Sequence, residues 1–202
     1  MRKRLPKEIW LAEYQQEPVD IQGRLFGSLI KMPEAEFEQI KGKNEGCIAY
    51  IDVADQGADY TALLIGSIIG NKVYCVDYLF TRENTDITIP LCAAKLDKWN
   101  VSYCRVESNS MGAMFSRILQ KNTKARILQV QNQTNKMTRI IMQSAFILNN
   151  FVFVEKNDPQ FFQFVENIFS FTKEGRNKND DAPDCAAGLA MFIQAMFKTI
   201  KW

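Results

Sequence analysis

The chain of 202 residues contains no histidine. This absence excludes Ser–His and Cys–His catalytic groups, HExxH zinc sites and any imidazole general base. Five cysteines are present but form no Cys-x-x-Cys pair, and this odd number predicts reduced thiols. Any chemistry must therefore depend on carboxylates, lysines or metal ions.

Two longer features are also missing. No apolar run approaches the ~20 residues of a membrane span, so we expect no contact with a membrane. No G-x-x-x-x-G-K-[ST] phosphate loop occurs, so we do not expect ATP-driven translocation in this chain. The composition, with 47% hydrophobic and 24% charged residues, is typical of a globular protein with one sizeable core.

Negative charge is absent from one long stretch. No Asp or Glu occurs from Ser108 to Val154. A stretch with only positive charge indicates either a surface for a polyanion or an ordinary solvated helix face. Six basic residues lie in it: Arg117, Lys121, Lys124, Arg126, Lys136 and Arg139.

Hydrophobic periodicity and turn signals divide the chain in two. Residues 1–45 are irregular apart from a short predicted helix at 33–40, and we interpret them as an N-terminal appendage. Residues 46–202 show a regular order of elements and form the predicted domain. We expect strands at 47–53, 61–69, 72–80, 101–107, 126–130 and 151–154, and helices at 87–99, 112–120, 135–148, 159–169 and 181–199. Three strands followed by alternating helices and strands predict an α/β fold with a mixed β-sheet flanked by helices.

Carboxylates stand at the ends of three predicted elements. Asp52 follows four apolar or aromatic residues at the end of the first strand, and Glu107 ends the fourth strand. Asp181 and Asp184 open the last helix. Carboxylates that converge repel one another, and their cluster is stable mainly when divalent cations neutralise it. The pattern predicts metal-dependent phosphoryl chemistry.

Each motif has a structural alternative. The segment from Asp52 to Thr61 is also typical of a surface turn, although an unpaired charge after an apolar strand is costly. Within it, Asp55 and Asp59 either add an outer contact to a metal or serve the turn. Asp181 is well placed to cap the last helix. Because Asp184 lies three residues later on the same helix face, we prefer it as the metal ligand, with Asp181 as the alternative.

Three motifs carry a family resemblance. They are Asp52–Thr61, with the pattern D-x-A-D-x-G-x-D-x-T, Val106–Asn109, and Asn179–Ala186. Together they resemble the C-terminal nuclease domain of the large terminase subunit of tailed bacteriophages. The segments Glu13–Val19 and Gly23–Phe26 resemble the connection between the terminase ATPase domain and its nuclease. The last motif often begins with His in this family, whereas Asn179 stands near that place here, so any role of that His must be absent or met otherwise.

The resemblance implies a ribonuclease H-like fold and a metal-dependent endonuclease that cuts double-stranded concatemeric viral DNA during genome packaging. Two Mg²⁺ or Mn²⁺ ions would lie roughly 3.5–4 Å apart with Asp52 between them. Glu107 would bind one ion, and Asp184 or Asp181 the other. Residues expected to contact DNA phosphates are Lys136, Arg139, Lys173, Arg176 and Lys178.

The resemblance also implies partners and a location. Residues 1–45 would be a linker from an ATPase domain that this chain lacks. Portal protein and the small terminase subunit would be partners, at the procapsid portal in the host bacterial cytoplasm. Three alternatives stay open: a Holliday-junction resolvase-like nuclease, a fragment of an actin-like phosphotransferase, and a DNA-binding module without catalytic activity.

Overall fold

The computed structural model describes residues 23–54, 59–107, 110–174, 177 and 179–199. Its centre is a seven-stranded sheet in the order β1-β7-β4-β3-β2-β5-β6. β3 runs antiparallel to β2 and β4, and the other neighbouring strands are parallel. The strands are β1 (Lys31–Pro33), β2 (Gly46–Asp52), β3 (Thr61–Ile69), β4 (Lys72–Thr81), β5 (Tyr103–Glu107), β6 (Arg126–Val130) and β7 (Phe151–Glu155).

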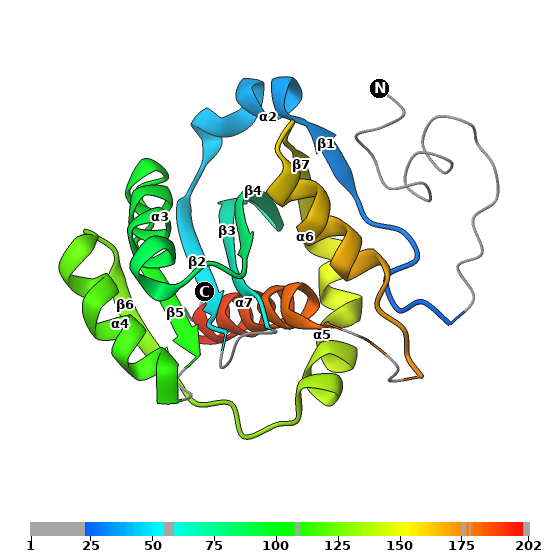
Figure 1. Ribbon diagram of the computed structural model, residues 1–202. Coiled ribbons are helices and arrows are strands. Elements are labelled where there is room, and N and C mark those ends of the chain that lie inside the picture. Colours follow the sequence, from blue (N-terminus) through cyan, green and yellow to red (C-terminus); the bar gives the residue numbers. More distant parts are fainter. Residues whose placement is uncertain (1–22, 55–58, 108–109, 175–176, 178, 200–202) are drawn as a thin grey trace.

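Helices cover both faces of this sheet (Figure 1). α3 and α4 pack on one face, and α5, α6 and α7 pack on the other, each group over its own cluster of buried side chains. The α/β fold with a mixed sheet flanked by helices is therefore confirmed. The helices are α2 (Glu34–Ile40), α3 (Thr85–Lys98), α4 (Ser110–Asn122), α5 (Lys136–Asn150), α6 (Pro159–Phe169) and α7 (Asp181–Thr199).

Strand β2 shows how the sequence positions the later site. Side chains alternate between the two faces of a strand. Ile48 and Tyr50 accordingly join the cluster under α5, α6 and α7, whereas Ala49 and Ile51 join the cluster under α3 and α4. Asp52 continues this alternation and lies on the same face as Tyr50. The apolar run before it is continuous because both faces of the strand are buried.

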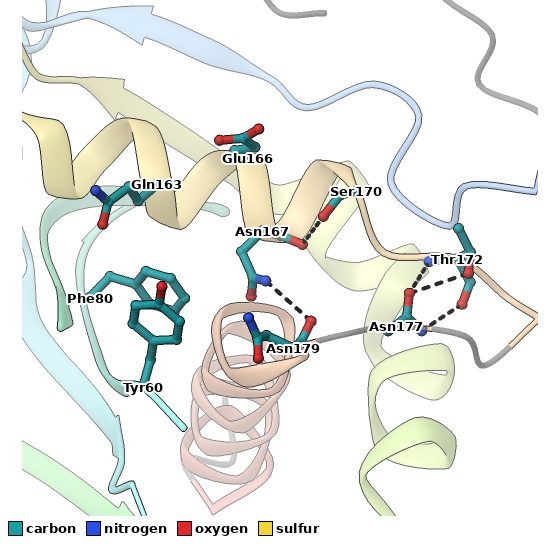
Figure 2. Close-up of a pocket in the computed structure, with 9 residues that line it drawn as sticks. All are labelled: Tyr60, Phe80, Gln163, Glu166, Asn167, Ser170, Thr172, Asn177 and Asn179. Atoms are coloured by element: carbon teal, nitrogen blue, oxygen red, sulfur yellow. Dashed lines mark hydrogen bonds between the residues drawn. The ribbon is translucent and has the colours of Figure 1, made fainter. Parts of the chain in front are cut away.

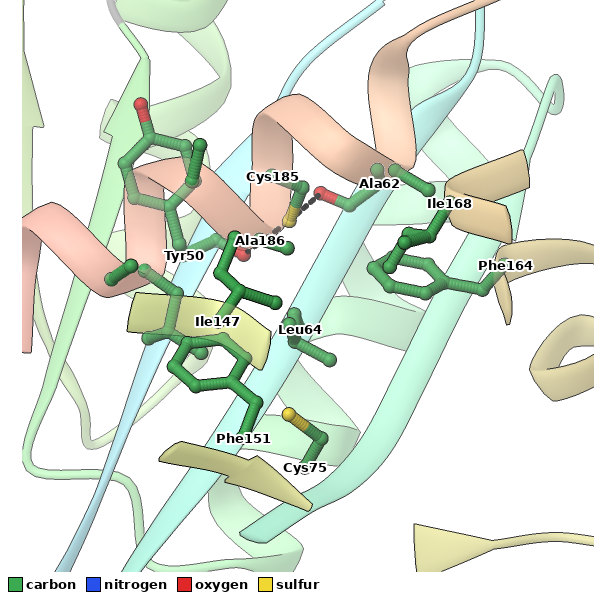
Figure 3. Close-up of a cluster of buried hydrophobic side chains, with 14 of the residues drawn as sticks. Tyr50, Ala62, Leu64, Cys75, Ile147, Phe151, Phe164, Ile168, Cys185 and Ala186 are labelled. Atoms are coloured by element: carbon green, nitrogen blue, oxygen red, sulfur yellow. Dashed lines mark hydrogen bonds between the residues drawn. The ribbon is translucent and has the colours of Figure 1, made fainter. Parts of the chain in front are cut away.

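Helix α7 packs across the central strands β2 and β3, and its first ten residues, 181–190, are accordingly all buried. Gly188 lies directly against the ring of Tyr50, where a Cβ atom would come within 2.3 Å of the ring. The Sγ of Cys185 donates to the backbone carbonyls of Tyr50 and Ala62, at 3.4 Å each (Figure 3). These small side chains let the helix approach β2 and β3 closely.

Local signals account for several element boundaries. Gly70 has a φ of 58° in the turn between β3 and β4, where a residue with a Cβ atom would be strained. The side chain of Asn135 accepts from the Met137 N–H at the start of α5. Asp158 does the same for the Gln160 N–H at the start of α6, with Pro159 in the first turn. The helices and strands expected within residues 46–202 are confirmed, with ends that differ by a few residues.

The stretch before β2 contacts the same sheet. β1, which the sequence pattern did not predict, pairs in parallel with β7, and the side chain of Phe26 is fully buried. The helix predicted at 33–40 is present as α2. The interpretation of residues 1–45 as a linker stays a prediction, and residues 1–22 lie outside the described residues. Within the described part of the chain, every helix is too short or too polar to span a bilayer.

Candidate metal centre

Three carboxylates from separate elements meet at one edge of the sheet. Oxygen atoms of Asp52, Glu107 and Asp184 all lie within 4.8 Å of one another. Asp52 and Asp184 are buried, and the Glu107 side chain keeps 17% of its surface exposed. The cluster therefore offers buried oxygen atoms with one open side, an arrangement that fits a hard divalent cation.

The sheet topology explains this meeting. β2 and β5 are parallel neighbours, with Ile51 opposite Val106. Asp52 and Glu107 each follow one of these residues, so both carboxylates emerge at the same edge. The close packing of α7 on β2 brings Asp184, in the first turn of that helix, over this edge. Three segments far apart in the sequence thus provide one cluster.

Arg139, in the first turn of α5, is inserted into the cluster. Its Nε donates to Asp184 Oδ1 at 2.7 Å, and its Nη2 donates to Asp184 Oδ2 at 2.5 Å. The same Nη2 lies 3.3 Å from Glu107 Oε2. Only 2% of the Arg139 side chain is exposed. The expectation that Arg139 lies on an exposed face of the acid-free stretch is therefore wrong, because the helix turns it toward the carboxylates.

Lys136, the first residue of α5, lies three residues before Arg139 on the same side of the helix. Its Nζ is 3.1 Å from Asp52 Oδ2, 3.2 Å from Asp181 Oδ1 and 3.6 Å from Asp184 Oδ2. The side chain keeps 36% of its surface exposed. Lys136 therefore connects the carboxylates to solvent, and its role toward DNA phosphates stays a prediction.

The balance of charge in this cluster is negative. Two cations, Lys136 and Arg139, face five carboxylates: Asp52, Glu107, Asp180, Asp181 and Asp184. Buried charges need compensation, and this set has fewer cations than anions. The excess of carboxylate oxygen favours binding of a divalent cation.

Burial changes the proton affinities of these groups. It raises the pKa of Asp52 and of Asp184 above their ordinary values, although Lys136 and Arg139 respectively oppose the rise. Burial alone would lower the pKa of Lys136, but the surrounding carboxylates raise it above its ordinary value. Lys136 therefore stays charged, and protons compete with a metal ion for the carboxylates at low pH.

Asp181 shares Lys136 with Asp184 but also has a partner of its own. Its Oδ2 accepts a hydrogen bond from the backbone N–H of Tyr60 at 3.1 Å, and its Oδ1 accepts from Lys136. The backbone carbonyl of Asp180 accepts the N–H of Asp184, which places Asp180 at the N-cap position of α7. Asp181 is the first residue of α7, and its side chain connects the helix to the residue before β3.

Tyr50 and Asn132 were missed by sequence reasoning. The Tyr50 hydroxyl lies 3.5 Å from Glu107 Oε2 and accepts a hydrogen bond from Asn132 Nδ2 at 2.8 Å. Burial raises the pKa of Tyr50 far above its ordinary value, so the hydroxyl keeps its proton. Tyr50 stands two residues before Asp52, so strand periodicity alone placed it on the same face. No comparable signal in the sequence indicates Asn132.

The other expected site residues are distributed as follows. Lys173 and Asp59 are exposed, and so are four basic residues of the acid-free stretch: Arg117, Lys121, Lys124 and Arg126. Asp55, Arg176 and Lys178 lie outside the described residues. Their expected contacts with metal or DNA stay predictions.

Comparisons with known proteins agree with this geometry. A family model described as "Terminase Bacteriophage T7, Ribonuclease H-like domain" matches residues 51–152, half of the chain. This range includes Asp52, Glu107, Lys136 and Arg139 but ends before α7. No curated protein matches the chain in sequence.

Solved structures show the same fold at low sequence identity. The human cytomegalovirus terminase nuclease domain superposes with a TM-score of 0.57 at 14% identity, covering 88% of this chain and 95% of that one. The nuclease domain of the bacteriophage SPP1 large terminase, solved with bound Mn, gives 0.55 at 14% identity, covering 79% and 92%. The large terminase of a thermophilic bacteriophage gives 0.55 at 10% identity over 75% of this chain.

The chain spans only 40% of this last large terminase but nearly all of the two isolated nuclease domains. The similarity thus concerns the nuclease part of these proteins. From the match to the family model and the shared fold, this chain belongs to the terminase family of the bacteriophage T7 type, as its ribonuclease H-like domain.

Proposed function

We propose that this chain is the nuclease of a viral DNA-packaging machine and that it cuts double-stranded DNA with the help of divalent cations. The observation that carries the proposal is the meeting of Asp52, Glu107 and Asp184, whose oxygen atoms lie within 4.8 Å of one another. Membership of the terminase family and the fold shared with terminase nuclease domains support the choice of DNA as substrate.

Asp52, Glu107 and Asp184 are the residues that would hold the ions. Two Mg²⁺ or Mn²⁺ ions, when bound, lower the pKa of the attacking water and stabilise charge on the leaving oxygen of the phosphodiester. In this proposal Asp52, Glu107 and Asp184 would each contribute carboxylate oxygens to these ions. Asp181 supports the arrangement through Lys136 and the Tyr60 N–H.

The basic residues of α5 hold these carboxylates in place. Arg139 donates to both oxygens of Asp184 and also to Glu107. Its planar guanidinium therefore fixes the relative orientation of these two proposed metal ligands. Lys136 contacts Asp52, Asp181 and Asp184 and balances part of their charge before cations enter. In this proposal Lys136 also meets a DNA phosphate at the open side of the cluster, and the partial exposure of its side chain supports this role.

The setting follows from the family. We propose that the chain works beside an ATPase domain, the portal protein and the small terminase subunit, at the procapsid portal in the host bacterial cytoplasm. Its substrate would be concatemeric viral DNA, held by exposed basic residues that contact phosphates and carry little sequence information.

Incubation with supercoiled plasmid tests the proposal. We expect nicked and linear products with Mn²⁺ or Mg²⁺, no products with a chelator, and no products from the Asp52→Asn variant. Four-way junctions provide the matched substrate for a resolvase. Preferential cutting of junctions would favour a resolvase-like nuclease, and absence of cutting at any divalent metal concentration would overturn the nuclease proposal.

A further inference from the structure

A second site candidate lies beside the metal centre, in a cavity of about 380 Å³ between α6 and the start of β3 (Figure 2). Gln163 and Asn167 of α6, the rings of Tyr60 and Phe80, and Asn179 just before α7 line this cavity. Its volume falls within the ~300–1,000 Å³ of small-molecule sites. The lining is mostly aromatic, amide and hydroxyl, with Glu166 as its one carboxylate, and so differs from the carboxylate cluster.

One wall of the cavity is a rigid aromatic stack. The rings of Tyr60 and Phe80 are parallel within 5°, with centroids 4.1 Å apart. The guanidinium carbon of Arg82 lies 4.2 Å from the centre of the Tyr60 ring. The Tyr60 ring therefore contacts both an aromatic ring and a guanidinium, and these contacts restrict its movement. The exposed side chain of Arg82 places a positive charge beside this stack.

Three polar groups of the lining have unused hydrogen-bonding capacity. Within the part of the chain that the structure describes, the Tyr60 hydroxyl and the side-chain amides of Gln163 and Asn179 make no hydrogen bond. Asn167 differs, because its Nδ2 donates to the Asn179 carbonyl at 3.2 Å and its Oδ1 accepts from Ala182. Asn167 is thus held in place by its own hydrogen bonds, whereas the other three side chains provide free donors and acceptors.

Two residues that line the cavity, Tyr60 and Asn167, also contact the segment that carries the carboxylates of the metal centre. The backbone N–H of Tyr60 donates to Asp181, and Asn167 accepts the N–H of Ala182 in the first turn of α7. That turn carries Asp184. A ligand in the cavity therefore lies next to the segment that presents the carboxylates.

We propose that this cavity receives an unpaired nucleobase of the DNA strand held at the metal centre; this inference rests on the proposed nuclease function. An amide side chain offers both a donor and an acceptor, as does a hydroxyl, so Gln163, Asn179 and Tyr60 can pair with the edge of any base. The Phe80 ring supplies an apolar wall, and Arg82 is placed to meet a phosphate of the same strand. Recognition of this kind discriminates unpaired from paired DNA and tolerates different sequences.

Equilibrium binding in Ca²⁺, in the absence of Mg²⁺ and Mn²⁺, tests this assignment. The probes are a blunt duplex and the same duplex carrying one unpaired 2-aminopurine. We expect the wild-type protein to bind the second DNA about tenfold more tightly, the effect of two or three neutral hydrogen bonds, and to change the fluorescence of its reporter base. Gln163→Ala, Asn179→Ala and Tyr60→Phe should each reduce this ratio. Tyr60→Phe keeps the stacked ring and the backbone N–H that holds Asp181.

Gln39→Ala is the matched control, because Gln39 is an exposed glutamine on α2, away from the cavity. It should leave the ratio unchanged. Equal affinity of the wild type for both DNAs, or an unchanged ratio in all three cavity variants, would overturn the inference. Binding of deoxyadenosine monophosphate without any preference for the unpaired DNA would overturn the assignment to a DNA strand. Plasmid cleavage by the same wild-type preparation reports on the proposed function separately.

Discussion

Arg139 and Asp184 form a buried ion pair in which the guanidinium binds both carboxylate oxygens, at 2.7 and 2.5 Å. The two side chains are 2% and 0% exposed. Because both partners lose their hydration, a buried ion pair adds little net stability. Its main effect here is to fix the relative positions of the two side chains. The pair joins the first turn of α5 to the first turn of α7, so it positions one carboxylate of the candidate metal centre.

Removing the cation of this pair should be costly. Arg139→Met leaves Asp184 buried without its bidentate partner, and we expect a loss of about 3–5 kcal/mol in the free energy of unfolding of the metal-free protein. Urea denaturation measures this loss. Asp184→Asn in the same chain should recover part of it, because the uncompensated charge disappears. Arg126→Met, at an exposed position on β6, is the control and should cost less than about 0.5 kcal/mol. A loss below about 1 kcal/mol for Arg139→Met would contradict the arrangement.

Asp52→Asn should reduce the increase in melting temperature that divalent cations produce. A ligand at a hundred times its dissociation constant stabilises a protein by about 2.7 kcal/mol, or roughly 5–10 °C in melting temperature for a chain of this size. We expect a shift of this order when Mn²⁺ is added to the wild type and less than half of it in the variant. Glu83→Gln removes an exposed carboxylate elsewhere and should respond like the wild type. Equal shifts in Asp52→Asn and the wild type would exclude Asp52 as a ligand.

The two acidic residues that begin α7 can be separated by substitution. Asp184 belongs to the cluster of converging oxygens, whereas Asp181 binds the Tyr60 N–H and Lys136. Asp184→Asn should therefore eliminate Mn²⁺-dependent plasmid cleavage, and Asp181→Asn should retain part of it. Calorimetric titration with Mn²⁺ should show the same order of loss. Full cleavage by both variants would rule out a ligand role for this helix.

Gly188→Ala should disturb the packing of α7 against β2. The added Cβ would come within 2.3 Å of the buried Tyr50 ring, which has little room to move. Overpacking of this kind costs about 1–3 kcal/mol, and the shift of α7 should also lower the cleavage rate. Thermal denaturation and plasmid cleavage report the two effects. Gly42→Ala, where an added Cβ meets no atom within 4 Å, is the control. Unchanged stability of Gly188→Ala would show that α7 accommodates the methyl group freely.

The exposed part of the acid-free stretch can be tested through salt dependence. Each phosphate contact contributes a slope of about −0.9 in log affinity against log salt on duplex DNA. The double substitution Arg117→Ala and Lys121→Ala on α4 should reduce the magnitude of that slope by roughly one to two, with a similar loss across unrelated sequences. The pair Lys41→Ala and Lys43→Ala, on the short 3₁₀ turn after α2, should leave it unchanged. An unchanged slope in the α4 variant would assign these charges to an ordinary solvated surface.

Much of the fold could be predicted because its signals are local. The apolar run that ends at Asp52 and the turn at Gly70 identify strands by their own composition. β1 was not predicted, since three residues carry too little periodicity and their pairing with β7 is a long-range contact. The contact of Asp181 with the Tyr60 N–H was likewise not predictable, because it joins residues more than a hundred positions apart in the sequence.

The order of residues was enough to show which carboxylates stand at the ends of predicted elements, and therefore that Asp52, Glu107, Asp181 and Asp184 were candidates for one site. What lies between them depends on tertiary packing. Arg139 belongs to a run of basic residues that is typical of a surface, yet the rotation of α5 against α7 directs its guanidinium inward. Periodicity reports which side of a helix is apolar, but the partner of a charged side chain depends on how distant elements pack. The same packing forms the cavity beside Tyr60, whose walls come from segments more than a hundred residues apart.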